Sequence, residues 1–167
     1  MKFLADSMLG KLARWLRMMG QDTTYNIELN DNELLELAKK ENRTLLTKDL
    51  ELYKRAIARG IDSFYIEGNI ESERLARIAF RYDLRLVLDM EKSYCPICNS
   101  KLQSTPKEQL IGKVEKNTFT YYDKFWKCPN CGQVYWQGAH WKQISSTISE
   151  AQEKMEDLSK TLSKQPL

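Results

Sequence analysis

Short apolar runs alternate with helically spaced apolar residues over the first 91 positions of the chain. The runs rich in β-forming residues are residues 3–5, 22–25, 43–47 and 61–66. Each run is followed by a segment whose apolar residues recur every three or four positions, as Leu12, Leu16 and Met19 do after the first. Four strands alternating with four helices predict an α/β fold, with a largely parallel sheet and helices on both faces.

The expected helix boundaries carry suitable residues. Gly20 and Gly60 stand where the first and third helices should end, and Asn30 stands where the second should begin. The apolar run 84–88 is either one more edge strand or the linker that closes this unit.

The pattern changes at Lys92. Pro, Cys, Asn and Gly interrupt short β-prone pieces such as residues 118–122 and 134–136, which predicts a small β module without a clear helix. Residues 144–163 then carry an apolar stripe typical of an amphipathic helix, which we expect to pack on the body or on a second chain. The stripe consists of Ile144, Ile148, Ala151, Met155, Leu158 and Leu162. The predicted domains are therefore 1–91, 92–142 and 143–167.

Composition adds limits on class and location. The chain has 167 residues, of which 42% are hydrophobic, so it can bury a core. No run approaches the roughly 20 apolar residues of a membrane span, and the first residues lack the apolar core of a signal peptide. We therefore expect a cytoplasmic protein that does not contact a membrane.

The four cysteines form two pairs, Cys95 with Cys98 and Cys128 with Cys131, each with two intervening residues. Four thiolates at this spacing close a tetrahedral zinc shell, so we predict a structural zinc in a ribbon. A redox role or a pair of disulfides is the alternative. With four sulfur ligands available, the only histidine, His140, is expected to be structural or to contact RNA.

Three carboxylates are expected at one edge of the predicted sheet. Asp6 directly follows the first strand, Asp49 follows the third after Lys48, and Asp31 opens the helix after the second. Ligands of open parallel sheets bind outside the carboxyl ends of the strands. Clustered acids at this edge would hold Mg²⁺ or Mn²⁺, which suits phosphodiester hydrolysis. Asp22 is a weaker candidate, and the alternative is that each acid caps a helix.

Basic and aromatic residues point to an anionic partner. Lys11, Arg14 and Arg17 recur every three residues along one helix face, which either meets phosphate or is simply solvated. From Lys92 to Lys142 the chain has eight lysines and three acids, interleaved with aromatic residues. Such a mixture is typical of RNA binding, although some of the rings must form the small core of the module.

The sequence resembles the PIN-like ribonuclease family known as the Mut-seven C-terminal domain. The resemblance covers roughly residues 2–142. It is carried by FLADSMLGKLARWLRMMG at 3–20, Asp22, Asp31, the triplet Thr47-Lys48-Asp49, YCPICN at 94–99, CPNCG at 128–132 and YWQGAHW at 135–141.

The resemblance implies a PIN-like fold with a fused zinc ribbon and a metal-dependent ribonuclease activity. Asp6 and Asp49 match the strand-end acids of the family, and Asp31 is the preferred third. A fourth acid of the wider PIN pattern is not evident. Lys48 stands where Arg is more usual, which keeps the charge but loses the bidentate fork.

Our leading interpretation is a ribonuclease in which Asp6, Asp31 and Asp49 bind Mg²⁺ or Mn²⁺. Arg14, Arg17 and Lys48 would engage phosphates, and the ribbon would assist RNA binding. The main alternative is a non-catalytic RNA- or ribosome-binding protein, with the C-terminal helix as a surface for the ribosome or another protein. A phospho-acceptor receiver domain also clusters acids at strand ends, but it offers no use for the basic ribbon.

Overall fold

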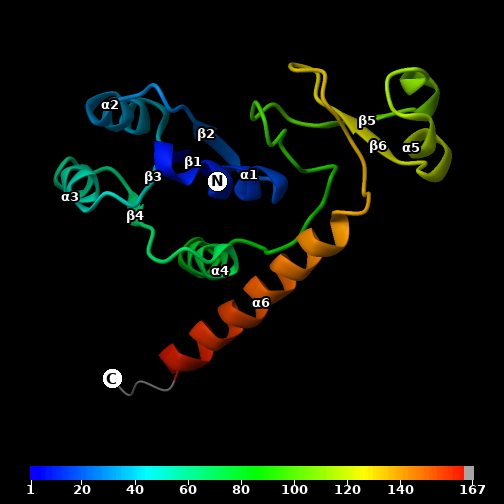
Figure 1. Ribbon diagram of the computed structural model, residues 1–167. Helices are drawn as coiled ribbons and strands as arrows, with labels where there is room; N and C mark the ends of the chain where they lie inside the picture. Colours follow the sequence, from blue (N-terminus) through cyan, green and yellow to red (C-terminus); the bar gives the residue numbers. More distant parts are fainter. Residues whose placement is uncertain (164–167) are drawn as a thin grey trace.

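The computed structural model describes residues 1–163 (Figure 1). Its main sheet has four parallel strands in the order β2, β1, β3, β4. The strands are β1 (Lys2–Ala5), β2 (Asp22–Tyr25), β3 (Thr44–Thr47) and β4 (Ser63–Tyr65). The predicted α/β fold with a parallel sheet is confirmed. The connection that leaves β1 runs to β2 on one side, whereas the connection that leaves β3 runs to β4 on the other side. The two connections therefore diverge between β1 and β3.

Helices cover both faces of this sheet. They are α1 (Gly10–Met18), α2 (Asp31–Glu41), α3 (Leu50–Ala58) and α4 (Glu71–Tyr82). Alternate residues of β1 separate the two cores: Phe3 joins the cluster formed by α1 and α4, whereas Leu4 joins the cluster formed by α2 and α3. Both strand residues are fully buried, so the sheet has no solvent-exposed face at its centre.

The predicted helix boundaries are confirmed by their local geometry. Asn30 accepts hydrogen bonds from the backbone N–H groups of Asn32 and Glu33, and the Glu33 side chain returns one from the Asn30 N–H, which completes a capping box. Gly20, with φ of 78°, follows α1 in the left-handed conformation that favours glycine.

The cysteine-bearing module has a three-stranded antiparallel sheet. Its elements are β5 (Gln103–Thr105), the 3-10 helix η2 (Lys107–Leu110), α5 (Lys116–Tyr121), β6 (Phe125–Lys127) and β7 (Val134–Tyr135). The prediction of β structure at residues 118–122 is wrong, because this segment lies largely in α5. Strand propensity depends on neighbours on a pleated surface, and this small sheet pairs only β5, β6 and β7.

The segment 84–88 is a linker and forms no strand. Leu84 and Leu86 are buried in the core beside α1 and α4. The Leu86 carbonyl accepts a hydrogen bond of 2.7 Å from the Gln152 side chain. This segment therefore uses its apolar residues to hold the C-terminal helix.

The C-terminal helix, α6 (Trp141–Ser163), begins three residues before the predicted start and packs along α4 (Figure 1). Ile148 and Ala151 enter the core cluster of α1 and α4, and Lys154 forms an ion pair with Glu73. Packing on the body is thus what the structure shows. The Leu162 side chain and the tail 164–167 lie outside the described residues, and the division at 91 and 142 remains a proposal.

None of the helices within residues 1–163 is both long enough and apolar enough to cross a membrane.

The packing of α6 can be tested at Ile148, whose side chain is 5% exposed. Replacement of Ile148 by Ala should lower the free energy of unfolding by roughly 2–4 kcal/mol, because it leaves a cavity between α6 and α4. Ser149→Ala, at an exposed position of the same helix, should change it by less than about 0.5 kcal/mol. Urea unfolding at two protein concentrations is the measurement. Equal stability of the two variants, or a loss that depends on concentration, would contradict packing within one chain.

Candidate active site and zinc centre

Asp6 lies at the carboxyl end of β1 and is held from two sides. Its Oδ1 accepts a hydrogen bond from the Ser7 N–H, and its Oδ2 accepts one of 2.8 Å from the Thr47 hydroxyl. The register of β1 against β3 pairs Ala5 with Leu46, so the residues that follow them, Asp6 and Thr47, lie side by side. The carboxylate is 8% exposed, so the fold fixes its position rather than leaving it on a free side chain.

Thr47 also connects Asp6 to Asp49. Its hydroxyl oxygen accepts a hydrogen bond of 2.9 Å from the Asp49 backbone N–H while it donates to Asp6. Asp49 is exposed and caps α3, because its Oδ1 accepts from the backbone N–H groups of Glu51 and Leu52. One hydroxyl therefore links the Asp6 carboxylate to the Asp49 backbone, and the capping bonds use only the Oδ1 of the Asp49 carboxylate.

Asp31 points to a different partner. It is half-exposed at the start of α2, and its carboxylate forms an ion pair of 2.8 Å with Arg55 of α3. Within the described residues, the only group of three or more His, Cys, Asp or Glu side chains close enough to share a metal ion is the set of four cysteines. Of the three predicted acids, Asp6 is thus linked to the backbone of Asp49, and Asp31 is paired with arginine.

Asp22 lies at the opposite edge of the sheet, so its candidacy is wrong. It is the first residue of β2 and forms an ion pair of 2.9 Å with Arg43, beside a hydrogen bond of 2.7 Å from the Asn99 amide. Burial raises the pKa of Asp22, but the hydrogen bonds from Arg43 and Asn99 outweigh it and the pKa lies below its ordinary value. The role of Asp22 is to hold chain segments together.

Glu71 is a carboxylate that the sequence reasoning missed. It is the first residue of α4, which follows β4, and it is 9% exposed. Its Oε1 pairs with Arg74, whereas its buried Oε2 has no hydrogen-bond partner among the described residues. An acid at the first helical position after a strand is the same signal that identified Asp31, and Glu71 could have been found in the same way.

The three predicted phosphate ligands differ in their surroundings. Arg14 is exposed on α1, and Lys48 is partly exposed with its ammonium 2.8 Å from the Asn69 side-chain oxygen. Arg17 is 4% exposed and donates to the carbonyls of Thr23, Pro96 and Ile97. Its predicted phosphate contact is therefore wrong, and so is the alternative of a solvated face, because the guanidinium is buried and committed to backbone oxygens.

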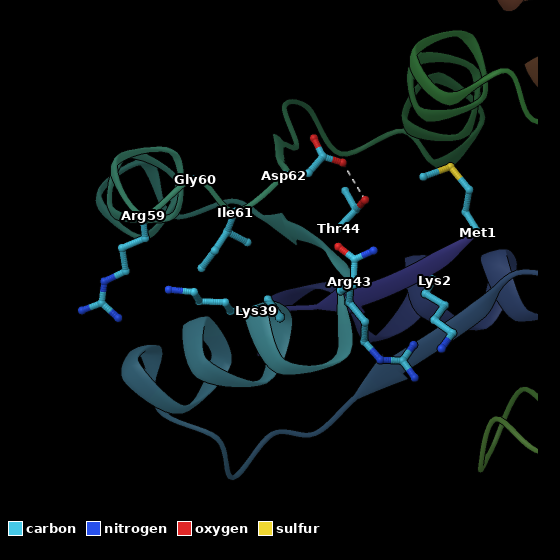
Figure 2. Close-up of a pocket in the computed structure, with 11 residues that line it drawn as sticks. Met1, Lys2, Lys39, Arg43, Thr44, Arg59, Gly60, Ile61 and Asp62 are labelled. Atoms are coloured by element: carbon cyan, nitrogen blue, oxygen red, sulfur yellow. Dashed lines mark hydrogen bonds between the residues drawn. The ribbon is translucent and has the colours of Figure 1, made fainter.

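A hollow of about 450 Å³ opens at the other edge of the sheet, around the amino ends of the strands (Figure 2). Lys2, Arg43 and Thr44 line it, and Thr44 donates a hydrogen bond of 2.7 Å to Asp62. This hollow contains neither Asp6 nor Asp49. The candidate active site is therefore the carboxyl edge and not this basic hollow.

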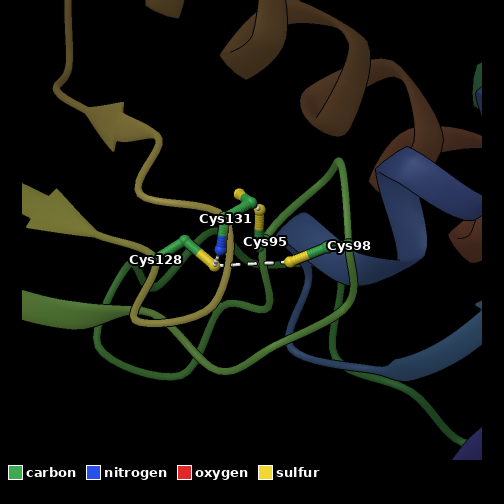
Figure 3. A group of neighbouring side chains, drawn as sticks. All are labelled: Cys95, Cys98, Cys128 and Cys131. Atoms are coloured by element: carbon green, nitrogen blue, oxygen red, sulfur yellow. Dashed lines mark hydrogen bonds between the residues drawn. The ribbon is translucent and has the colours of Figure 1, made fainter.

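The four cysteines converge as predicted (Figure 3). All four sulfur atoms lie within 4.8 Å of one another, with 3.6 Å between those of Cys95 and Cys131 and 3.3 Å between those of Cys98 and Cys128. Tetrahedral zinc with Zn–S bonds of 2.3 Å separates its sulfur ligands by about 3.8 Å. The cluster fits a structural zinc. His140 is exposed and is not part of the set.

The thiols do not share one ionisation state. Burial opposes ionisation of Cys98, but hydrogen bonds from Asn130, Ser100 and Cys128 lower its pKa to about 5. For Cys131, a hydrogen bond from the Gln133 backbone lowers the pKa, but desolvation and the neighbouring sulfurs outweigh it and raise the pKa to about 12. A negative charge on one sulfur opposes the ionisation of the next thiol, and a divalent cation bound among the sulfurs relieves this repulsion.

The first cysteine loop is fastened to the edge of the main sheet. Besides the bonds from Arg17, the Tyr94 N–H donates to the Arg17 carbonyl and the Ser93 hydroxyl donates to that of Met18. The Asn99 side chain accepts from the Thr23 N–H while it donates to Asp22. The zinc centre and the sheet are thus joined by short hydrogen bonds rather than by a free linker.

Comparison with known proteins gives one positive result. A family model described as the Mut7-C RNAse domain matches residues 1–148. A search of curated proteins and a search of solved structures found no match. The matched residues include both the carboxyl edge of the sheet and the four cysteines.

The zinc assignment predicts one zinc ion per chain after purification without chelator. Cys95→Ser should lower the bound zinc below about 0.2 per chain, because sulfur is replaced by a poor ligand in a closed four-sulfur shell. Ser104→Ala, at an exposed position of the same module, should keep full zinc. Elemental analysis after gel filtration makes the comparison, and full zinc in the cysteine variant would contradict the assignment.

The buried role of Arg17 predicts a sharp contrast with Arg14, its neighbour one turn away on α1. Arg17→Met should lower the free energy of unfolding by roughly 2–4 kcal/mol, because three carbonyls lose their donor. Arg14→Met should cost less than about 0.5 kcal/mol, since Arg14 is exposed. Thermal and urea unfolding of the zinc-loaded proteins measure both, and equal losses would refute the structural assignment.

Proposed function

This chain belongs to the Mut7-C RNAse domain family, and from that premise we propose that it is a metal-dependent ribonuclease that hydrolyses RNA phosphodiester bonds at the carboxyl edge of its parallel sheet. The observation that carries the proposal is the buried Asp6 carboxylate, which the Thr47 hydroxyl links to the backbone N–H of Asp49, so that both acids lie at the same edge of the sheet. The pair lies where the connections from β1 and β3 diverge, the usual place for a ligand in an open parallel sheet.

Asp6 and Asp49 are the proposed ligands of Mg²⁺ or Mn²⁺, with Asp31 as the third. Carboxylate oxygens are the ligands that these hard cations prefer. Such a cation, when bound, orients a phosphodiester and lowers the pKa of an attacking water. The ion pair with Arg55 uses the Oδ2 of Asp31, so its Oδ1 is the proposed ligand atom.

The remaining residues of the site bind and position. Ser7 and Thr47 hold the Asp6 carboxylate before substrate arrives, which avoids the cost of ordering it later. Arg14 and Lys48 are the proposed phosphate contacts, and the Asn69 oxygen holds the Lys48 ammonium beside the site. Glu71 is a further candidate at this edge, because one of its buried oxygens lacks a partner among the described residues.

The zinc ribbon is proposed to assist RNA binding through its lysines and aromatic side chains, in a cytoplasmic protein. A second candidate, an RNA- or ribosome-binding protein without catalysis, draws support from the ion pair of Asp31 with Arg55 and from the capping bonds of Asp49. Both contacts give these acids structural roles. The two proposals differ in whether RNA is cut.

The purified zinc-loaded chain should cleave RNA only when Mg²⁺ or Mn²⁺ is added, and Asp6→Asn should reduce the rate by at least about 100-fold. An amide keeps the shape of the side chain but removes the charge that holds the cation. Gel analysis of labelled RNA across a series of metals is the measurement, beside a matched DNA.

The matched control is Asp83→Asn, at the end of α4. Asp83 has φ of 51°, a left-handed conformation that asparagine adopts readily, so this change should leave both fold and cleavage intact. Cleavage without divalent metal, or full activity of Asp6→Asn, would refute the catalytic proposal. Tight RNA binding without any cleavage would favour the second candidate.

A further inference from the structure

An aromatic hollow of about 470 Å³ lies where the ribbon meets the start of α6. Side chains of Tyr122, Trp136, His140 and Trp141 line it, with Thr118 of α5 at one side. Its size falls within the roughly 300–1,000 Å³ of ordinary small-ligand sites. None of the residues at the carboxyl edge of the main sheet lines it.

A second hollow adjoins the first. It measures about 520 Å³ and shares four lining residues with it: Thr118, Gln133, Val134 and Trp136. Lys113 and Glu115 line this second hollow but not the first. Aromatic rings line the first hollow, and charged side chains line part of the second. The Trp136 indole lines both.

The position of Trp136 depends on a glycine. A Cβ placed on Gly138 would lie 2.7 Å from the indole Nε1, so only glycine lets the ring lie against the backbone there. Tyr122 and Phe125 contact the same ring, at centroid distances of 6.5 Å and 6.4 Å. Phe125 is buried, whereas Trp136 and Tyr122 are partly exposed. Part of this aromatic group therefore remains open to a ligand.

The charges around the hollows favour an anionic ligand. Lys113 lines the second hollow, Lys116 begins α5 and Lys142 follows Trp141; all three are exposed. The acids are fewer, since Asp123 is already paired with Lys107 and Glu115 is the only carboxylate that lines a hollow, beside the proposed zinc ligand Cys131. Aromatic faces beside lysines are the combination that binds the bases and phosphates of single-stranded nucleic acid.

We propose that the aromatic hollow receives an unpaired base of single-stranded RNA and that the adjoining hollow receives the next ribose and phosphate beside Lys113. This deepens the proposed function, on which its choice of RNA rests, by assigning a base-binding site apart from the cleavage site. A base held there must leave any helix, so the ribbon selects unpaired RNA. An acidic peptide is the competing ligand, but it has no flat ring to stack between Tyr122 and the two tryptophans.

The test is a binding titration of the zinc-loaded full chain without Mg²⁺ or Mn²⁺. The probe is a fluorescein-labelled RNA of six uridines, followed by anisotropy, and the same unlabelled RNA is followed by tryptophan quenching. Tyr122→Ala should weaken binding by at least about fivefold, because one stacking surface is lost. Tyr121→Ala is the matched control: Tyr121 is 79% exposed and lines neither hollow, so its loss should change the affinity by less than about twofold.

Two further variants separate binding from folding. His140→Ala changes an exposed wall of the hollow and should also weaken binding by more than about twofold, with zinc content unchanged. Trp136→Phe keeps a ring in place, so the affinity should stay within about threefold while the quenching amplitude falls. If Trp136 had a purely structural role, RNA would quench the Trp136→Phe variant with the same amplitude as the unaltered protein.

Three outcomes would overturn the base-binding site. The first is equal affinity of the Tyr122 and Tyr121 variants when both retain zinc, and the second is tighter binding of duplex RNA than of the six-uridine RNA. The third is displacement of the labelled RNA by a hexaglutamate peptide at a lower concentration than by unlabelled RNA. Asp6→Asn should leave quenching unchanged. Loss of cleavage therefore bears on the proposed nuclease, whereas loss of quenching in the Tyr122 variant bears on the hollow.

Discussion

Parallel pairing of the strands is the constraint on which the site depends. Once β1 and β3 lie side by side in register, their next residues, Asp6 and Thr47, must meet at one edge, and a single hydroxyl then joins the Asp6 carboxylate to the Asp49 backbone. The leucines and alanine of these strands are fully buried, so the edge is rigid. The position of the Asp6 carboxylate thus follows from the hydrophobic packing of the strand residues just before it.

A second constraint joins the ribbon to the sheet. Arg17 places a buried guanidinium against backbone carbonyls of the first cysteine loop, and Asn99 links the same loop to Asp22 and Thr23. From the other side, α6 leaves the ribbon and packs on α4. The ribbon is held at both ends of its sequence. A zinc ion bound by the four cysteines would therefore also support the edge of the main sheet.

Local patterns predicted most of this fold but not its long-range partners. Asp6 and Asp49 could be found because strand ends of a parallel sheet share one edge, and the same rule would have found Glu71. Arg17 could not be understood from helical spacing, since its partners at Pro96 and Ile97 lie about 80 residues along the chain. Asp31 likewise looked free until α3 brought Arg55 to it. The segment 118–122 was misassigned because its β-forming residues have no strand beside them.

Diffraction from crystals soaked in Mn²⁺ shows whether a divalent cation binds at Asp6 and Asp49. Anomalous scattering locates manganese independently of any assumed activity. We expect an anomalous peak within about 2.5 Å of a carboxylate oxygen of Asp6, with Asp49 as a second ligand. Manganese bound elsewhere, with the Asp6 carboxylate still held only by Ser7 and Thr47 in crystals whose protein cleaves RNA, would contradict it.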